Sequence, residues 1–193
     1  MAPLTKTEHK HARRLRPLFG VLLGAILFAR MVPSQENAMM QARRTPTEYE
    51  VKAAFLLNFV KFIEWPDPKR SGAVPLSICV FGADPFGTAL DQIVQGERIN
   101  GRPLVVKRLK KWRDDCDAVF ISRSEKDLPE VLQQIGPRVL TVGESSDFLT
   151  SGGMINFVVE DRRIRFDVNR GAAERGSVRI SSRLLSVARA VLK

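Results

Sequence analysis

The stretch YEVKAAFLLNFVKFIEWP, residues Tyr49–Pro66, predicts one long, largely apolar helix that Pro66 stops. Its apolar side chains recur at helical spacing, and only Lys52, Asn58 and Lys61 interrupt them. Three polar positions are too few for a broad solvated face, so the helix must be buried on most sides. It is either the first core helix of its own domain or a helix docked on a partner. The candidate partner contacts on it are Phe59, Phe62 and Trp65.

The chain before this helix has the pattern of an export signal. Basic residues between Lys10 and Arg16 precede an apolar run from Leu18 to Ala29, which is shorter than the roughly 20 residues a membrane span needs. We therefore expect a signal peptide over residues 1–29 and a periplasmic protein, with an uncleaved inner-membrane anchor as the alternative. Residues 30–46 are expected to be a flexible tether and residues 47–193 the folded domain.

The net charge of +10 shrinks once this leader is set aside. Six basic and two acidic residues precede Ala38, so 25 basic and 19 acidic residues remain, a net charge of +6. This modest positive net charge favours binding to acidic partner surfaces and to other anionic groups of the cell envelope. No basic stripe interleaved with aromatic residues occurs, so we expect no nucleic-acid binding.

The domain alternates short apolar runs with helical segments, which is typical of parallel βαβ units. Strands are predicted at 76–81, 104–109, 118–122 and 139–142. Helices are predicted from Asp84 to about Val94 and from Asp127 to about Ile135. The fold class expected is α/β: a single three-layer Rossmann-like domain with a mainly parallel sheet.

In the last forty residues the alternation of strands and helices gives way to a different pattern. Met154–Val159 and Ile164–Val168 are joined by a charged turn and predict an antiparallel hairpin at the edge of the sheet. A final helix is expected from about Ser182 to Leu192. Basic residues gather here, and they either form a solvated face or bind an acidic partner or effector. Arg165 and Arg179 are the candidates for that contact.

Cys79 and Cys116 are the only two cysteines, and both lie in the part expected to be exported. An even number in an oxidising compartment predicts one disulfide, although two buried free thiols are the alternative. In a doubly wound sheet the strands at 76–81 and 118–122 would be neighbours, which would bring the two cysteines together.

The sequence contains few of the residues and motifs that are typical of a catalytic site. The only histidines, His9 and His11, lie in the leader, and the chain has neither a Gly-x-Ser-x-Gly elbow nor a Walker sequence. Asp114, Asp115 and Asp117 are expected in a solvated loop, and the Gly82–Gly87 turn is expected to be an ordinary strand-to-helix connection. We expect no enzyme activity, no cofactor and no metal.

The amino-acid sequence of the domain resembles the YfiR-like family of periplasmic regulators over about residues 47–192. The first helix carries the family pattern Tyr-x-Val-Lys-Ala-Ala-Phe, then Asn-Phe, then Phe-x-x-Trp-Pro. Further matching segments follow in order: LSICVFGADPFG (76–87), CDAVFIS (116–122), GGMINF (152–157), RIRFDVN (163–169), Ala172-Ala173 and VRISSRLL (178–185). The chain departs from some relatives in having a single cysteine pair.

This resemblance implies a non-enzymatic regulator that represses an inner-membrane diguanylate cyclase by binding its periplasmic part. It also implies a possible second partner, an outer-membrane lipoprotein, and the apolar helices allow a homodimer. The alternative is a periplasmic small-ligand-binding module that serves another membrane sensor or a transporter, because a single α/β lobe is similar to half of a solute-binding protein.

Overall fold

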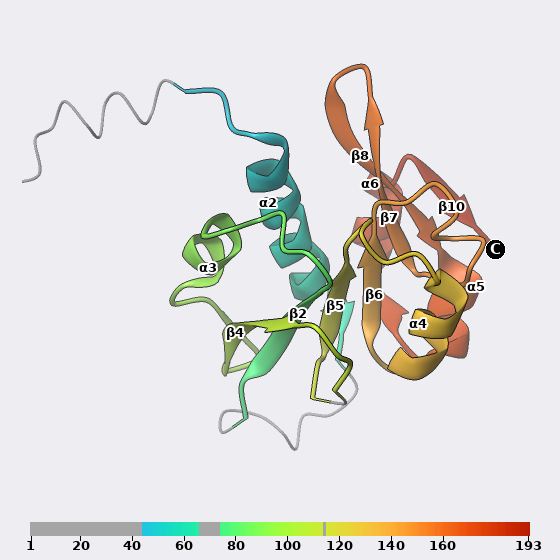
Figure 1. Ribbon diagram of the computed structural model, residues 1–193, viewed down its shortest axis with the longest axis horizontal. Helices are drawn as coiled ribbons and strands as arrows, with labels where there is room; N and C mark the ends of the chain where they lie inside the picture. The colour runs from blue at the N-terminus through green and yellow to red at the C-terminus, as the bar shows by residue number, and fades with distance from the viewer. Residues whose placement is uncertain (1–43, 66–73, 114) are drawn as a thin grey trace, which may run out of the picture. The chain divides into compact units, whose positions relative to one another are not determined.

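The computed structural model in Figure 1 describes residues 44–65, 74–113 and 115–193. The expected signal peptide and nearly all of the expected tether lie outside these residues, as does Asp114. None of the helices in the described ranges is long and apolar enough to cross a membrane.

The first described helix, α2 (Glu48–Lys61), begins at the expected capping box: Thr47 accepts from the Glu50 N–H, and the Glu50 carboxylate accepts from the Thr47 N–H. The helix was expected to run to Trp65, but it ends four residues earlier. Ile63–Glu64 leave it to form strand β1, which pairs antiparallel with β9 (Arg179–Ile180). The Ser181 N–H also donates to the Phe62 carbonyl at 3.0 Å. Strand pairing therefore replaces the last turn of the expected helix.

The main sheet is mostly parallel, and its eight strands run in the order β10-β8-β7-β6-β5-β2-β4-β3. The expected α/β fold class is therefore confirmed, and β2 and β5 are neighbours as doubly wound topology requires. The antiparallel pairs are the β7–β8 and β3–β4 hairpins. The strands are β2 (Leu76–Phe81), β3 (Arg98–Ile99), β4 (Arg102–Leu109), β5 (Ala118–Ile121), β6 (Leu140–Gly143), β7 (Ile155–Glu160), β8 (Arg163–Asn169) and β10 (Ala190–Leu192).

The remaining helices are short: α3 (Ala89–Val94), α4 (Leu128–Ile135), α5 (Arg170–Arg175) and α6 (Ser182–Val187). The prediction that α3 begins at Asp84 is wrong, because Asp84 caps a turn instead. Its carboxylate accepts from the Phe86 N–H at 2.8 Å and from Arg108 at 2.7 Å. Asp127 caps helix α4 as expected.

The C-terminal segment also differs from the prediction. Helix α6 ends at Val187, and the chain then extends into β10, which pairs parallel with Asp167–Asn169 of β8. The Arg189 N–H donates to the Phe166 carbonyl at 2.9 Å, which starts this pairing. The β7–β8 hairpin therefore lies one strand in from the edge, and its turn projects at the top of Figure 1.

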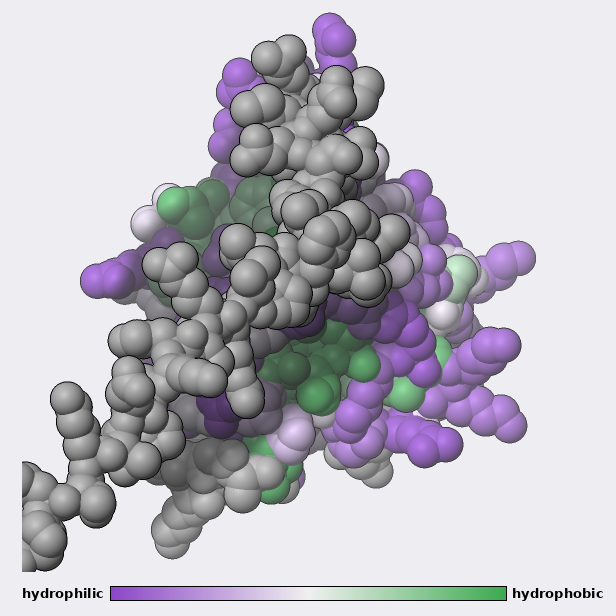
Figure 2. All heavy atoms as spheres, turned by 90° about the vertical axis from the view of Figure 1, so that its left-hand side faces the viewer, coloured by the Kyte–Doolittle hydropathy of each residue, from purple (hydrophilic) through white to green (hydrophobic). Residues whose placement is uncertain are grey.

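Apolar side chains fill two layers, one on each face of the sheet. The larger layer packs α2, α3 and α6 on one face. The smaller contains α4 and the Cys79 side chain on the other. Phe59 is fully buried in the larger layer, with its ring centroid 5.4 Å from Phe157 and 4.8 Å from Phe166. In Figure 2, which views the domain from the side of α3 and β4, described hydrophilic residues dominate and hydrophobic ones show in patches.

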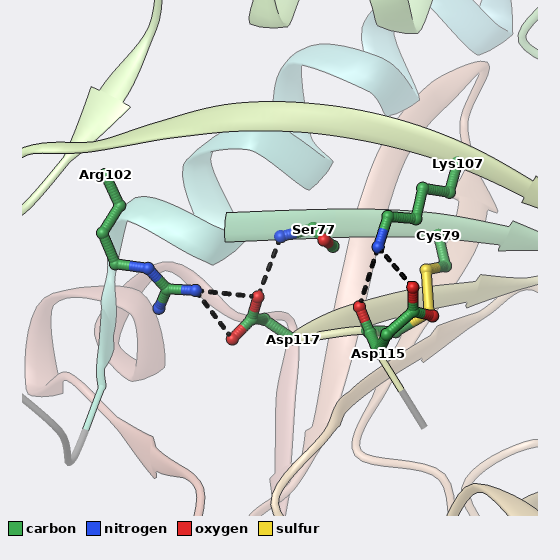
Figure 3. Close-up of a disulfide and its surroundings, with 7 residues drawn as sticks. Ser77, Cys79, Arg102, Lys107, Asp115 and Asp117 are labelled. Atoms are coloured by element: carbon green, nitrogen blue, oxygen red, sulfur yellow. Dashed lines mark hydrogen bonds and ion pairs between the residues drawn. A yellow bond between two sulfur atoms is a disulfide. The ribbon is translucent and has the colours of Figure 1, made fainter. Parts of the chain in front are cut away.

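The disulfide Cys79–Cys116 is present and joins β2 to the chain just before β5 (Figure 3). Of the acidic residues beside it, Asp115 is exposed as expected, whereas Asp117 is only partly exposed, which corrects the expectation for that residue. Asp117 accepts from the Ser77 N–H at 2.8 Å and from Arg102, and Asp115 pairs with Lys107 at 2.6 Å. Arg102 also donates to the Val74 and Pro75 carbonyls, both at 2.9 Å. The disulfide and these ion pairs together tie β2 and β4 to the chain just before β5.

Replacing both Cys79 and Cys116 by alanine should lower the melting temperature by about 10 °C. The cross-link closes a span of 37 residues, which corresponds to about 4 kcal/mol of lost chain entropy in the unfolded state. Calorimetry of the double variant measures this. Wild-type protein in excess reductant is the control and should show the same fall, and an unchanged melting temperature in both would exclude a structural role.

Candidate partner-binding groove

The usual ligand site of a doubly wound fold, at the carboxyl ends of the strands where the strand order reverses, is closed in this protein. That point lies between β2 and β5. The Ser122 N–H donates to the Phe81 carbonyl at 3.0 Å, and the Ala83 N–H donates to Ser124 Oγ at 3.1 Å. A Cβ atom at Gly82 would lie only 2.8 Å from Ser124 Oγ. The two loops therefore occupy the crevice with their own atoms.

The carboxyl ends of β5 and β6 carry a buried ionic cluster instead. Lys52, which the sequence presented as a polar interruption of the helix, is only 1% exposed. Its ammonium group donates to Glu144, just after β6, at 2.6 Å, and to Glu48 one helical turn away. Glu144 also accepts from Arg123 at 2.9 Å and from the Tyr49 hydroxyl at 3.2 Å. The charges at this edge thus hold α2 in place.

Burial by itself would raise the pKa of the Glu144 carboxyl. Hydrogen bonds and positive charge from Arg123 and Lys52 outweigh burial and hold that pKa below its ordinary value. Glu144 is therefore ionised at neutral pH, as the buried Lys52 ammonium requires.

An open groove of about 850 Å³ lies elsewhere, around the small β1–β9 sheet. Helices α5 and α6 line it together with that sheet. Asn169 caps α5 by accepting from the Ala172 N–H at 2.8 Å, and Ser181 caps α6 by accepting from the Leu184 N–H. Because these caps fix where both helices begin, they also fix the spacing of the groove walls.

The groove combines an apolar lining with a charged rim. Ala173 and Val178 are buried, and Trp65, Ile180 and Leu185 are partly buried against the core. The rim carries Glu64, Arg170, Glu174 and Arg179. Arg170 and Glu174 form an exposed ion pair at 2.7 Å, and Glu64 lies directly across the small sheet from Arg179. A groove with this lining is suited to bind an apolar or aromatic side chain of a partner that is flanked by charged residues.

Two of the five residues proposed for partner contact meet in this groove: Trp65 and Arg179. The Trp65 indole N–H donates to the Val60 carbonyl at 3.0 Å, which orients the ring. Phe62 is partly buried and packs against the core at the end of α2. Arg165 lies instead on β8, beside a second hollow.

Phe59 cannot contact a partner, which corrects its place among the candidates. The side chain is fully buried among Phe55, Phe157 and Phe166, so its substitution would test the core. The helix period alone could not show this, because nearly every side of α2 is apolar.

The sequence did not predict β9 or α5, which supply much of the groove. The signals for α5 were present: Asn169 as a cap residue and Gly176 six residues after Arg170. A strand of two residues leaves no comparable signal. Within the described ranges no group of three or more His, Cys, Asp or Glu side chains could hold a metal ion.

The described residues form a small α/β domain that carries an open groove beside the β1–β9 sheet. The chain belongs to the YfiR/HmsC-like family, whose family model matches residues 49–189. Members of this family are periplasmic regulators rather than enzymes.

Among solved structures, the chain is similar to a conserved domain protein from Vibrio cholerae O1 biovar El Tor, at 12% sequence identity and a TM-score of 0.46. The match covers 75% of this chain, which spans 60% of the length of that protein. No curated protein matches the chain.

Glu144→Gln should lower the free energy of unfolding at pH 7 by about 3 kcal/mol, because it leaves the buried Lys52 without its inner charge partner. The folded-state pKa of Glu144 is lowered, so its stabilisation is complete above its ordinary pKa and is lost as the pH falls through the folded value. Urea unfolding at a series of pH values should show the difference between wild type and variant shrinking as the pH falls below the ordinary pKa of a glutamate carboxyl.

Glu48→Gln is the matched control, because that carboxylate is 42% exposed and should contribute at most about 0.5 kcal/mol. Equal losses for both substitutions would show that the inner pair does not hold α2.

Proposed function

We propose that this protein is a periplasmic, non-enzymatic regulator that binds and represses an inner-membrane signalling enzyme, most favourably a diguanylate cyclase. The observation that carries the proposal is the groove that Trp65 and Arg179 line together with the apolar residues Ile180 and Leu185. Aromatic and arginine side chains around an apolar pocket are the usual energetic centre of a protein interface. Family membership supports the regulatory role.

The proposed mechanism is preferential binding of the less active conformation of the enzyme. A bound regulator shifts a conformational equilibrium only by its difference in affinity for the two states, and moving 1:99 to 99:1 requires about 5.5 kcal/mol. Helix caps fix the walls of the groove, while the buried ion pair and the disulfide hold other parts of the domain. Little binding energy is then lost to ordering the regulator itself.

A second candidate function, capture of a small ligand, rests on the size of the groove. Its volume of about 850 Å³ lies within the usual range of small-molecule sites. The closed crevice between β2 and β5 argues against ligand binding at the more common position. Isothermal titration with small aromatic acids would distinguish this function from protein binding.

Trp65→Ala and Arg179→Glu should each weaken binding to the periplasmic part of the target enzyme by about tenfold or more, because truncating an interface centre costs about 2 kcal/mol. Surface plasmon resonance with the purified periplasmic part measures this. Lys126→Glu changes the charge at an exposed position before α4 that does not line the groove, and it should bind as wild type does. Unchanged affinity for both groove variants would remove this surface from the interface.

Deleting the gene should raise cellular cyclic dinucleotide levels and surface attachment, since the repressor is lost. Deleting the target cyclase gene as well should cancel the rise. Quantification of cyclic di-GMP in the single and double deletion strains tests this, with restoration of the gene as the control. Unchanged levels in the single deletion would reject the cyclase as target and favour the small-ligand function.

A further inference from the structure

The outer edge of β8 is only half covered. On one side, β7 pairs with β8 from Arg163 to Val168. On the other side, β10 pairs only with Asp167–Asn169. No strand of the described chain lies beside Arg163–Phe166 on that side, so this half of β8 is an open sheet edge.

The backbone groups that face this edge follow from the register. The hairpin turns through Asp161 and Arg162, both at positive φ, which is the two-residue turn that pairs Glu160 with Arg163. The Phe166 carbonyl already faces outward, because it accepts from the Arg189 N–H at 2.9 Å. Alternate residues of a strand point the same way. The N–H and C=O of Ile164 therefore face the open edge.

A hollow of about 350 Å³ accompanies the edge. It is lined by residues 163–166 together with Phe55 of α2 and Val187 of α6. Val187 is 62% exposed, and Phe55 is only partly buried. An incoming strand would thus meet apolar side chains on the face of the sheet that carries Ile164 and Phe166.

The opposite face carries positive charge that is left without a partner. Arg189 pairs with the carboxylates of both Asp167 and Glu160, to which its guanidinium donates at 2.9 Å and 3.2 Å. Arg163 and Arg165 stand two residues apart on this face and are exposed. Neither makes an ion pair with another described residue.

We propose that this edge binds an extended, acidic segment of a protein partner, which adds as a strand beside Arg163–Phe166. Main-chain hydrogen bonds to Ile164 would supply affinity. Alternate side chains would supply specificity: carboxylates toward Arg163 and Arg165, and apolar groups toward Val187 and Phe55. The surface is separate from the groove, so the proposal does not rest on the proposed function.

A second copy of this chain does not fit the edge. Two β8 edges related by a two-fold axis would place arginines opposite arginines, and like charges directly opposite each other are destabilising. A lipid surface fits less well than a peptide, because the apolar side chains line a hollow rather than a protruding wedge.

The test uses a synthetic peptide of alternating glutamate and valine and the purified protein. Hydrogen exchange measured by NMR should slow at the Ile164 amide when the peptide is added. The Arg165 amide, which already faces β7, should change little. Two further peptides carry N-methyl groups on alternate amides, one on the glutamate nitrogens and one on the valine nitrogens. The one whose methyl groups face β8 should bind at least about tenfold more weakly, and the other should bind like the unmodified peptide, because alternate amides of a strand point to opposite edges. A lysine–valine peptide should not bind.

Arg163→Glu and Arg165→Glu should each reduce binding of the glutamate–valine peptide by about tenfold or more. Arg162→Glu makes the same charge change in the turn, outside the lining of the hollow, and should change binding by less than about threefold. Trp65→Ala should leave peptide binding intact, which separates this edge from the groove.

Three results would overturn the proposal. They are no binding at about 1 mM peptide, equal binding of both N-methylated peptides, or full binding by both arginine variants. Binding to phosphatidylglycerol vesicles that depends on Arg163 and Arg165, without peptide binding, would reassign the edge to the membrane.

Discussion

The buried pair between Lys52 and Glu144 is the contact on which the arrangement of this domain depends. Helix α2 precedes every strand of the main sheet, so chain connectivity alone does not dictate which part of the sheet it covers. An ammonium group that is almost completely inaccessible must remain beside a carboxylate, and Glu144 offers one at 2.6 Å. The pair therefore fixes the amino-terminal half of α2 over the carboxyl ends of β5 and β6, while Phe59 fixes the other half against Phe157 and Phe166.

The position of α2 has consequences for the surface. Because the helix stops at Lys61, the next residues can reach β9 and place Trp65 beside Arg179. Arg123 and Glu144 form an ion pair within the same cluster. They lie at the carboxyl ends of the strands, the edge of the sheet where doubly wound folds usually bind ligands. The open groove thus lies at the other end of α2 from this ionic cluster, and it is the surface that the proposed function uses.

The C-terminal segment shapes both proposed interaction surfaces, the groove and the open edge of β8. Helix α6 supplies Leu185 to the groove and Val187 to the hollow beside β8. The change from helix to strand after Val187 leaves β10 too short to cover the full length of β8. One chain segment therefore closes the core while leaving a backbone edge and two arginines available on the other side.

Much of this was predictable from local sequence, and the rest was not. Apolar runs gave the four central strands, the capping box gave the start of α2, and the neighbouring strands brought Cys79 and Cys116 together. These features depend on spacing and on residues close in sequence. The end of α2, the strand β10, the burial of Phe59 and the meeting of Trp65 with Arg179 were decided only by the tertiary structure. The physical reason is that a two- or three-residue strand has no periodicity of its own, and forms only because a distant backbone edge accepts its hydrogen bonds.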